Sequence, residues 1–249
     1  MRVLKFGGTS VANAQNIKLV LDIVIKKAEH EKLIVVVSAF TKVTDLLVIA
    51  SQKAASNDES YKEIVTEIEK KHLDAIKELI PVSEQSGLLS HIKRIINHLE
   101  TLLDGCFLLG ELSPRTSDTI LSFGELLSSY IIAEAFKQKH KNSGYKDSRE
   151  LIKTNNNFGK AGVNFQLTNA LIADYFASND SQIVVMPGFI ASTEEGIGTT
   201  LGRGGSDYTA AILAGALNAS ELEIWTDVNG MFTANPKIVK QAQPIATIS

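Results

Sequence analysis

The sequence has little of what marks secreted, membrane-bound or nucleic-acid-binding proteins. A single cysteine, Cys106, excludes a disulfide framework and a zinc site of several thiolates. The 25 Lys and Arg residues are balanced by 28 Asp and Glu residues, so the chain lacks the basic excess with which many proteins bind nucleic acid. The apolar run at residues 33–37 is far shorter than the roughly 20 residues that a membrane helix needs. The first residues lead straight into a strand-like segment without a secretory signal. We therefore expect a cytoplasmic protein whose partners include neither a membrane nor a nucleic acid.

The histidines also lack a metal-binding arrangement. None is paired at a spacing such as HExxH, and each lies in a segment rich in Lys or Glu. We expect all five to lie on solvated helical faces. No cluster of carboxylates suggests a magnesium or calcium cage either. The sequence therefore predicts no metal site built by the protein itself.

What the chain does contain is an alternation of strand and helix patterns. Residues 3–6 and 33–37 are short apolar runs typical of buried parallel strands, and apolar residues recur at helical spacing between them. Strand, helix and strand within about 35 residues are typical of a βαβ unit. Residues 183–186 and 221–225 predict two further strands.

Two other segments complete the predicted organisation. From about residue 44 to residue 141 the periodicity is almost wholly helical. Near the other end, residues 208–217 predict a short helix capped by Ser206. The chain therefore reads as one α/β sandwich over residues 1–249, with a helical insertion at about residues 52–115.

The first motif with chemical meaning follows the first predicted strand. Lys5 ends the strand, and Gly7, Gly8 and Ser10 form the turn after it. A cation beside a glycine turn can hold an anion, because the backbone N–H groups of such a turn are free to face it. The GxxxxGK[ST] spacing of a Walker A loop is absent. A plain strand-ending turn with a solvent-reaching lysine explains this motif equally well.

A second glycine-rich segment, residues 202–207, opens the helix near the other end of the chain. Its glycines, including Gly204, allow close backbone approach, and a helix N-terminus favours negative charge. Arg203 can grip a carboxylate or a phosphate with two hydrogen bonds. Asp207 can complement the helix dipole instead of serving a ligand. Two anion-binding turns in one domain suit either a substrate with several phosphates or a phosphate donor together with an anionic acceptor.

Polar residues also stand at the ends of other predicted strands. Thr226 and Asp227 follow one strand, and Ser38 follows another, at the edge where open α/β sheets bind ligands. For Thr226 and Asp227 an Asx turn is an equally good explanation. Glu125 lies in an apolar helical segment, where Phe123 and Leu126 suggest partial burial.

Taken together, five of these segments resemble the aspartokinases of the amino-acid kinase superfamily, in the same order and spacing. They are KFGGTSV at residues 5–11, VVSA at 36–39, SFGELLSS at 122–129, PGF followed by TTLGRGGSD within 187–207, and WTDVNGMFTANP at 225–236. The residues of these segments are most similar to those in the kinase part of fused aspartokinase–homoserine dehydrogenases. The resemblance implies a three-layer αβα sandwich with an open, mainly parallel sheet. It also implies transfer of the γ-phosphoryl group of ATP, with Mg²⁺, to the side chain of L-aspartate.

The resemblance also implies roles for individual residues. It implies catalytic roles for Lys5 and Asp207, with Asp207 holding Lys5. The implied substrate-binding residues are Ser38, Thr44, Glu125, Arg203, Gly204 and Ser206. The implied ATP-binding residues are Gly7, Gly8, Ser10, Thr226, Asp227, Phe232 and Lys237.

The chain departs from the family pattern in the last of these segments. Phe232 stands where the family commonly has Tyr, and Asn235 and Lys237 stand where Asp and Arg are frequent. These changes concern the nucleotide contacts more than the reaction. The resemblance also leads us to expect further kinase and regulatory segments beyond Ser249, and a homo-oligomeric full-length protein. Two alternatives stay open: a related kinase that acts on glutamate, carbamate or UMP, and a module that binds ATP or aspartate without turnover.

Overall fold

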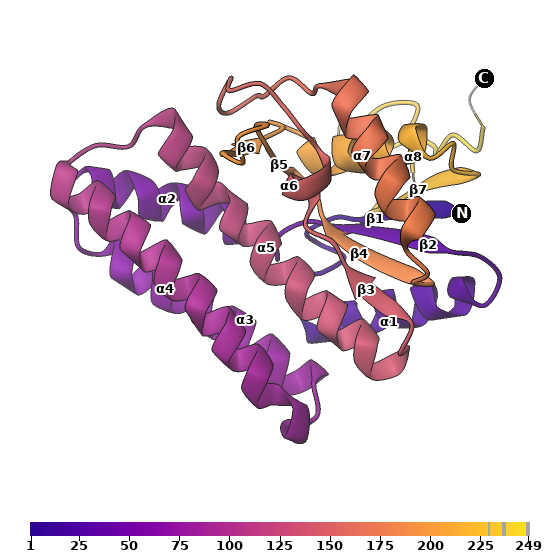
Figure 1. Cartoon of the computed structure of the whole chain (residues 1–249), viewed down its shortest axis with the longest axis horizontal. Coiled ribbons are helices and arrows are strands. Elements are labelled where there is room, and N and C mark those ends of the chain that lie inside the picture. Colours follow the sequence, from indigo (N-terminus) through magenta and orange to yellow (C-terminus); the bar gives the residue numbers. More distant parts are fainter. Residues whose placement is uncertain (229, 236–237, 248–249) are drawn as a thin grey trace.

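A five-stranded sheet, parallel throughout, forms the centre of the molecule (Figure 1). The computed structural model describes residues 1–228, 230–235 and 238–247. The strand order across the sheet is β3 (Ser143–Tyr145), β4 (Ile183–Pro187), β2 (Leu33–Val37), β1 (Arg2–Phe6) and β7 (Glu221–Trp225). The four strands expected from the sequence are therefore confirmed, and they pair side by side. Because all strands run the same way, their carboxyl ends lie along one edge.

Helices cover both faces of this sheet, as a continuous apolar run such as β2 requires. Successive side chains of a strand point to opposite faces. Val35 and Val37 pack in one core, and Ile34 and Val36 in another. The first core is completed by α1 (Ala14–Ala28), α2 (Val43–Ala55), α3 (Tyr61–Leu79), α4 (Gln85–Leu109) and α5 (Pro114–Lys139). The second is completed by α6 (Ser148–Leu151), α7 (Phe165–Ser178) and α8 (Gly205–Ala216). The predicted three-layer αβα sandwich is confirmed.

The long helical stretch forms one packed group, α2 to α5, in which α3 and α4 extend beyond the sheet (Figure 1). A short 3₁₀ turn, Val82–Glu84, joins α3 to α4 where Pro81 prevents a continuous helix. The helical content expected from residue 44 to residue 141 is thus confirmed. The predicted limits of an insertion, residues 52–115, include the end of α2 and all of α3 and α4.

Helix α5 is central to the packing. Among the described residues it is the one helix long and apolar enough to span a membrane by length and composition, and 72% of that apolar window is buried inside the protein. Such burial is what a core helix of a globular domain shows. Its N-cap Ser113 accepts a hydrogen bond from the Thr116 N–H at 3.1 Å, and Pro114 follows as the first helical residue.

Two expectations from the sequence are wrong. His72 is fully buried instead of solvated, and its ring stacks on Phe40 with centroids 4.8 Å apart. Burial lowers the pKa of His72 to about 4, so the ring is neutral. The helix near the end of the chain is not capped by Ser206, because α8 already begins at Gly205, after Gly204 in the left-handed conformation. The lysines next to His72 in the sequence suggested a solvated position. At the start of α8, Gly204 is the N-cap in place of the expected polar residue.

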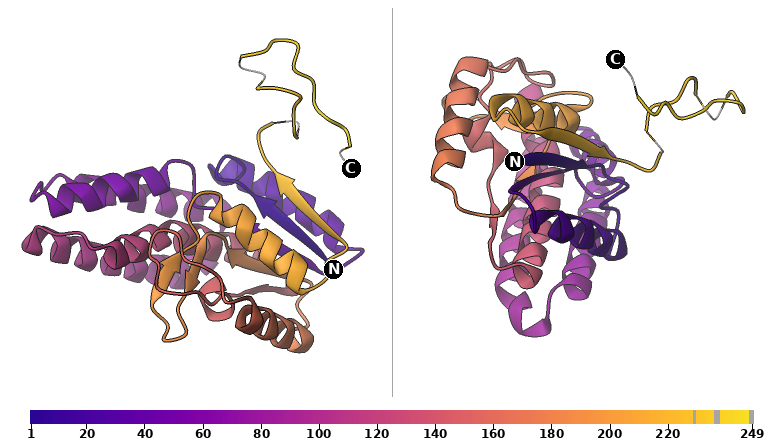
Figure 2. Two further views of the ribbon diagram at one scale, coloured as in Figure 1. Left: turned by 90° about the horizontal axis from the view of Figure 1, so that it is seen from above. Right: turned by 90° about the vertical axis from the view of Figure 1, so that its right-hand side faces the viewer.

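Two further segments frame the region where the strands end. An antiparallel hairpin of β5 (Ile190–Ser192) and β6 (Gly198–Thr200) follows β4 and leads into the glycine-rich segment before α8. After β7 the chain turns away from the sheet, and the described parts of residues 226–247 lie outside the three layers (Figure 2).

Candidate active site

A cavity of about 300 Å³ lies where the carboxyl ends of β1 and β2 meet the N-terminus of α8. All the residues that the sequence analysis assigned to catalysis and substrate binding line it: Lys5, Ser38, Thr44, Glu125, Arg203, Gly204, Ser206 and Asp207. These residues come from β1, the turn after β2, α2, α5 and the start of α8, and they are separated by up to about 200 positions in the chain. The fold therefore brings these eight predicted residues together.

Two of the residues that line this cavity form an ion pair. The Lys5 Nζ is 2.6 Å from the Asp207 Oδ1, and the lysine side chain is only 12% exposed. The backbone of Lys5 is held in place because β1 is hydrogen-bonded to β2 on one side and to β7 on the other. Asp207 is in the first turn of α8, where a carboxylate is also favoured by the helix dipole. The pair places one partly buried cation at the centre of the site.

The glycine-rich turn before α8 presents Arg203 to solvent. Gly202 and Gly204 have φ values of 75° and 72°, which favour glycine because it lacks a Cβ. Gly205 is packed closely as well, since a Cβ there would lie 2.7 Å from Phe189 Cδ2. Within the described part of the chain, no carboxylate forms an ion pair with Arg203. Its guanidinium is therefore available to an external anion.

Glu125 is the unusual group of the site. It is 4% exposed, and its Oε2 has no hydrogen-bond partner among the described residues. Burial raises the pKa of Glu125 to about 8, although a hydrogen bond from the Ala39 backbone opposes the rise. Gly124 beside it allows α5 to approach the turn after β2, because a Cβ there would lie 2.9 Å from Ala39 Cβ. A cation placed at Glu125 would restore the ionised carboxylate.

The turn after β1 joins this cavity to a neighbouring one. Gly8 approaches the Ala39 carbonyl so closely that a Cβ would lie 3.2 Å from it. The Gly7 N–H donates to the Trp225 carbonyl at 3.3 Å, and the Ser10 hydroxyl donates to the same oxygen at 3.4 Å. Two donors that the sequence suggested for an anion are thus occupied by β7. The backbone N–H of Gly8 has no acceptor in the part of the protein that the structure describes.

The residues predicted to bind ATP are only partly assembled. Ser10, Thr226 and Asp227 line the neighbouring cavity of about 250 Å³, at the carboxyl end of β7. Phe232 does not line it, and lies in the segment after β7, where it bridges to Pro244. Lys237 falls outside the described residues. Among the described residues, those predicted to bind ATP are therefore not gathered in one cavity.

Sequence reasoning gave no role to Phe189 or Gly188, although both lie in one of the quoted motifs. Phe189 lines the cavity with a φ of 67°, and its N–H donates to the Thr209 hydroxyl at 3.0 Å. Gly188 lies against Ser206, where a Cβ would be 2.6 Å from the Ser206 Cβ. The glycine after Pro187 was a visible signal of this close approach.

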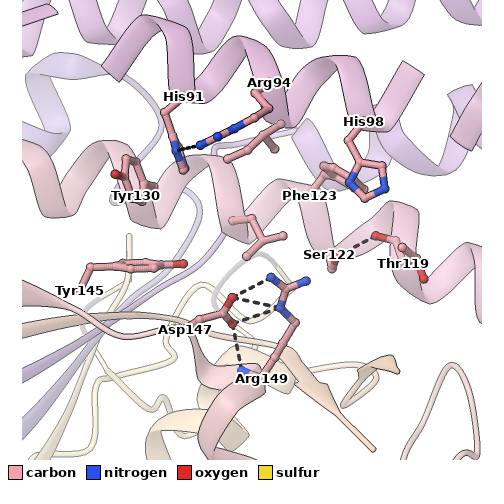
Figure 3. Close-up of a pocket in the computed structure, with 12 residues that line it drawn as sticks. His91, Arg94, His98, Thr119, Ser122, Phe123, Tyr130, Tyr145, Asp147 and Arg149 are labelled. Carbon is pink, nitrogen blue, oxygen red and sulfur yellow. Dashed lines mark hydrogen bonds and ion pairs between the residues drawn. The ribbon is translucent and has the colours of Figure 1, made fainter. Parts of the chain in front are cut away.

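A larger cavity of about 580 Å³ lies elsewhere, between α4, α5 and the segment from β3 to α6 (Figure 3). It contains none of the predicted site residues. Its charged groups already have partners: Arg149 binds Asp147 through contacts of 2.6–3.1 Å, and Arg94 donates to His91 Nδ1 at 2.8 Å (Figure 3). The smaller cavity is the better candidate because, among the described residues, Arg203 has no carboxylate partner and one oxygen of the buried Glu125 has no hydrogen bond.

The described residues include no group of three or more His, Cys, Asp and Glu side chains placed to hold a metal ion. The cavity of about 300 Å³, named the acceptor cavity from here on, has two carboxylates in its lining, Glu125 and Asp207. Asp207 already binds Lys5. Such a donor set fits a metal ion that arrives with a phosphate ligand better than a cage built by the protein.

Known proteins are similar to this chain along its whole length. Residues 1–249 match the Amino acid kinase family. The bifunctional aspartokinase/homoserine dehydrogenase 2 of Arabidopsis thaliana is 34% identical over 99% of this chain and 27% of that protein. The lysine-sensitive aspartokinase 3 of Escherichia coli is 35% identical over 99% of this chain and 53% of that protein.

A solved structure shares the fold as well. The E. coli aspartokinase III in complex with aspartate and ADP superposes with a TM-score of 0.89 and 34% identity, over 98% of this chain and 53% of that one. The chain thus spans about a quarter to a half of the length of these relatives. Both fused and unfused enzymes match it, so attachment to a dehydrogenase stays a prediction. From the family match over its full length and its three-layer fold, the chain belongs to the amino acid kinase family.

Proposed function

We propose that this chain is the catalytic part of an aspartate kinase. It transfers the γ-phosphoryl group of ATP to the side-chain carboxylate of L-aspartate and gives 4-phospho-L-aspartate, the first step toward lysine, threonine and methionine. The observation that carries the proposal is one cavity in which the Lys5–Asp207 pair, the buried Glu125 and the unpaired Arg203 meet. The relatives named aspartokinase and the neighbour solved with aspartate and ADP support the choice of substrates.

The acceptor chemistry fits this set of groups. An aspartate side chain has an ordinary pKa of about 3.9, so it is ionised at neutral pH and needs no general base. The difficulty is to bring a carboxylate up to an anionic phosphate, which positioned positive charge overcomes. In the transfer, an aspartate oxygen bonds to the γ-phosphorus, the bond from phosphorus to the β–γ bridging oxygen breaks, and ADP leaves. Lys5 neutralises the phosphoryl oxygens, and Asp207 keeps the lysine in place.

The amino-acid part of the substrate is recognised by groups of opposite charge. Arg203 binds the α-carboxylate through its two-pronged guanidinium. Glu125 receives the α-ammonium, which supplies the cation that its buried carboxyl lacks. Ser38, Thr44, Gly204 and Ser206 complete the wall around the substrate. A free amino acid is favoured over carbamate or UMP because those acceptors carry no ammonium for Glu125.

The nucleotide lies on the side of β7 and the first glycine turn. The turn of Gly7, Gly8 and Ser10 lies beside its phosphates. The Gly8 N–H is the donor best placed to bind them, because it has no acceptor among the described residues, whereas the Gly7 N–H and the Ser10 hydroxyl donate to Trp225. Thr226 and Asp227 contact the nucleotide from the end of β7, and Phe232 and Lys237 are proposed to act from the segment beyond. ATP enters as its complex with Mg²⁺, held mainly by phosphate oxygens, which adds positive charge at the transferring group.

The wider organisation belongs to the same proposal. Residues 1–249 form a kinase catalytic unit with a helical insertion at about residues 52–115, and further kinase and regulatory segments follow in the whole protein. The whole protein is a cytoplasmic homo-oligomer.

An acceptor panel tests the reaction. The whole natural protein is incubated with ATP, Mg²⁺ and hydroxylamine, which traps an acyl phosphate as a coloured hydroxamate, and with aspartate, glutamate, carbamate or UMP as the acceptor. ADP formation is measured in parallel. We expect the hydroxamate and ADP with aspartate alone. Product with another acceptor, or binding of ATP without ADP formation, would contradict the proposal.

A further inference from the structure

Asp118 is a buried carboxylate that lies outside the proposed chemistry. It is in the second turn of α5 and only 2% exposed. No cation forms an ion pair with it in the part of the chain that the structure describes. Its negative charge is instead met by four short contacts with neutral donors. A buried charge is costly without such partners, so this arrangement needs a reason.

The four contacts come from two segments that are distant in sequence. The Gly159 N–H donates to both carboxylate oxygens at 3.0 Å. The Thr200 N–H donates to Oδ2 at 2.9 Å, and the Thr200 hydroxyl donates to Oδ1 at 2.9 Å. Asp118 therefore ties α5 to the loop around Gly159 and to the last residue of β6.

One tied segment, β6, continues into the glycine-rich turn of the candidate site, and the other packs against that turn. Thr200 is three residues before Arg203. Gly202 packs against the other segment, since a Cβ there would lie 3.2 Å from the Gly159 carbonyl oxygen. The segments also bind one another, because the Ala161 N–H donates to the Thr200 carbonyl at 3.0 Å. Movement of either segment would shift Arg203 with it.

We propose that Asp118 is a positioning residue that fixes the turn at residues 202–205, and so sets the place of Arg203 for the acceptor's α-carboxylate. The inference rests on the proposed function for its substrate, but its structural part does not. The left-handed turn at Gly202 and Gly204 has broad freedom of its own, because glycine restricts the backbone least. A charged acceptor that holds several donors at once limits this freedom more than one neutral hydrogen bond would.

The variant Asp118→Asn tests the inference with little change of volume. Its amide keeps one acceptor oxygen but turns an NH₂ group toward the N–H donors of Gly159 and Thr200, so that part of the tie is lost. In the whole natural protein we expect the KM for aspartate to rise roughly ten- to hundredfold. The KM for ATP should stay within about twofold, because Arg203 does not line the cavity at the end of β7 that is assigned to the nucleotide. An equal rise of both constants, or an unchanged KM for aspartate, would overturn the inference.

Tyr61→Phe is the matched control for general loss of stability. It removes a hydrogen bond to Asp104 in the helical group, away from the glycine turn. We expect it to leave both KM values unchanged. Thr200→Val removes only the hydroxyl donor to Asp118, so its effect on the KM for aspartate should be smaller and should not add fully to that of Asp118→Asn. Full additivity would count against a shared tie.

Hydrogen exchange separates this inference from the proposed function. In Asp118→Asn, the amides of residues 199–206 should exchange faster, while those of β1 and β2 keep their protection. If the unaltered protein does not phosphorylate aspartate, the proposed function fails, and exchange still decides whether Asp118 holds the turn. Unchanged exchange at residues 199–206 would overturn the tie whatever the reaction is.

Discussion

Two of the cavities that α5 helps to line, the candidate site and the larger cavity, differ in what their charged groups bind. Glu125 points into the smaller cavity and Leu126 into the larger one, because neighbouring residues of a helix are roughly 100° apart around its axis. In the larger cavity, Arg149 and Arg94 are bound by Asp147 and His91. In the smaller one, Arg203 has no carboxylate partner among the described residues, and one oxygen of Glu125 has no hydrogen bond.

The difference teaches that unmet charge, and not volume, marks the site. A cavity whose ions bind one another is stable as it is and gains little electrostatic energy from a ligand. A buried carboxyl oxygen without a partner is a cost that a substrate cation removes, and a solvent-exposed guanidinium is available to a substrate anion. The smaller cavity is shaped by glycines that permit close approach, at residues 124, 202 and 205, and by the left-handed backbone of Gly204.

The largest effect is expected when the cation of the site is removed. Lys5→Met should lower turnover by at least about 100-fold, because Lys5 stabilises charge that develops on the transferring phosphoryl group. Circular dichroism should stay that of the unaltered protein, since the methionine side chain fills the same space. Turnover and the far-ultraviolet spectrum check this in the whole protein. Near-normal turnover would remove Lys5 from the reaction.

Arg203→Ala should have the next largest effect, on substrate binding. The KM for aspartate should rise roughly tenfold or more, with little change in the KM for ATP, because a charge-assisted bidentate contact is lost. Arg203→Lys should recover little, since an ammonium cannot form the same planar pair. Steady-state kinetics with each substrate varied in turn provide the test. Equal effects on both substrates would assign Arg203 to the phosphates.

Glu125 should make aspartate binding depend on pH. Its raised pKa of about 8 means that the free protein holds this carboxyl protonated at pH 7, whereas the substrate ammonium favours the ionised form. Binding should therefore release a proton below pH 8, and the KM for aspartate should fall as the pH rises from 6 to 8. Calorimetry in buffers of different ionisation enthalpy counts the proton. Glu125→Gln should bind aspartate more weakly and abolish the release.

Glu125 should also make the stability of the folded protein depend on pH. Rising pH should lower this stability, whereas it should strengthen aspartate binding. Because the folded pKa of Glu125 lies above the ordinary value of 4.5, its contribution to stability is present at low pH and is lost as the pH rises toward 8. Glu125→Gln should therefore unfold at a higher temperature than the unaltered protein at pH 8, in the absence of aspartate. Thermal unfolding at pH 5 and pH 8 measures this difference, and an equal or lower Tm at pH 8 would contradict it.

The smallest effect on activity is expected in the larger cavity. Arg149→Met removes a cation that lies 2.6 Å from a carboxylate, as Lys5→Met does. It should lower stability by about 1 kcal/mol, since the pair is partly exposed, and leave both KM values unchanged. Chemical denaturation and kinetics on the two variants form a matched pair. If Arg149→Met reduced turnover as much as Lys5→Met, the contrast between the cavities would fail.

Local patterns in the sequence determined much of this protein. The β-branched run of β2 predicted a strand covered on both faces, and the glycines after β1 and before α8 predicted two turns that approach other groups closely. These features depend on neighbouring residues and on backbone freedom, which a sequence displays directly. The family resemblance added the set of residues that line the acceptor cavity.

Only the tertiary structure decided what each charged or polar side chain meets. His72 stands in a lysine-rich helix, yet the packing of α3 against the turn after β2 buries it on Phe40. Asp118 has the sequence context of an ordinary helical acid, and its three hydrogen-bond donors come from residues 41 and 82 positions away. Among the described residues one oxygen of Glu125 lacks a partner, because α5 packs closely against the turn after β2 and buries the carboxyl. Burial and charge pairing depend on segments that are far apart in the chain, so the residue types near each position could not reveal them.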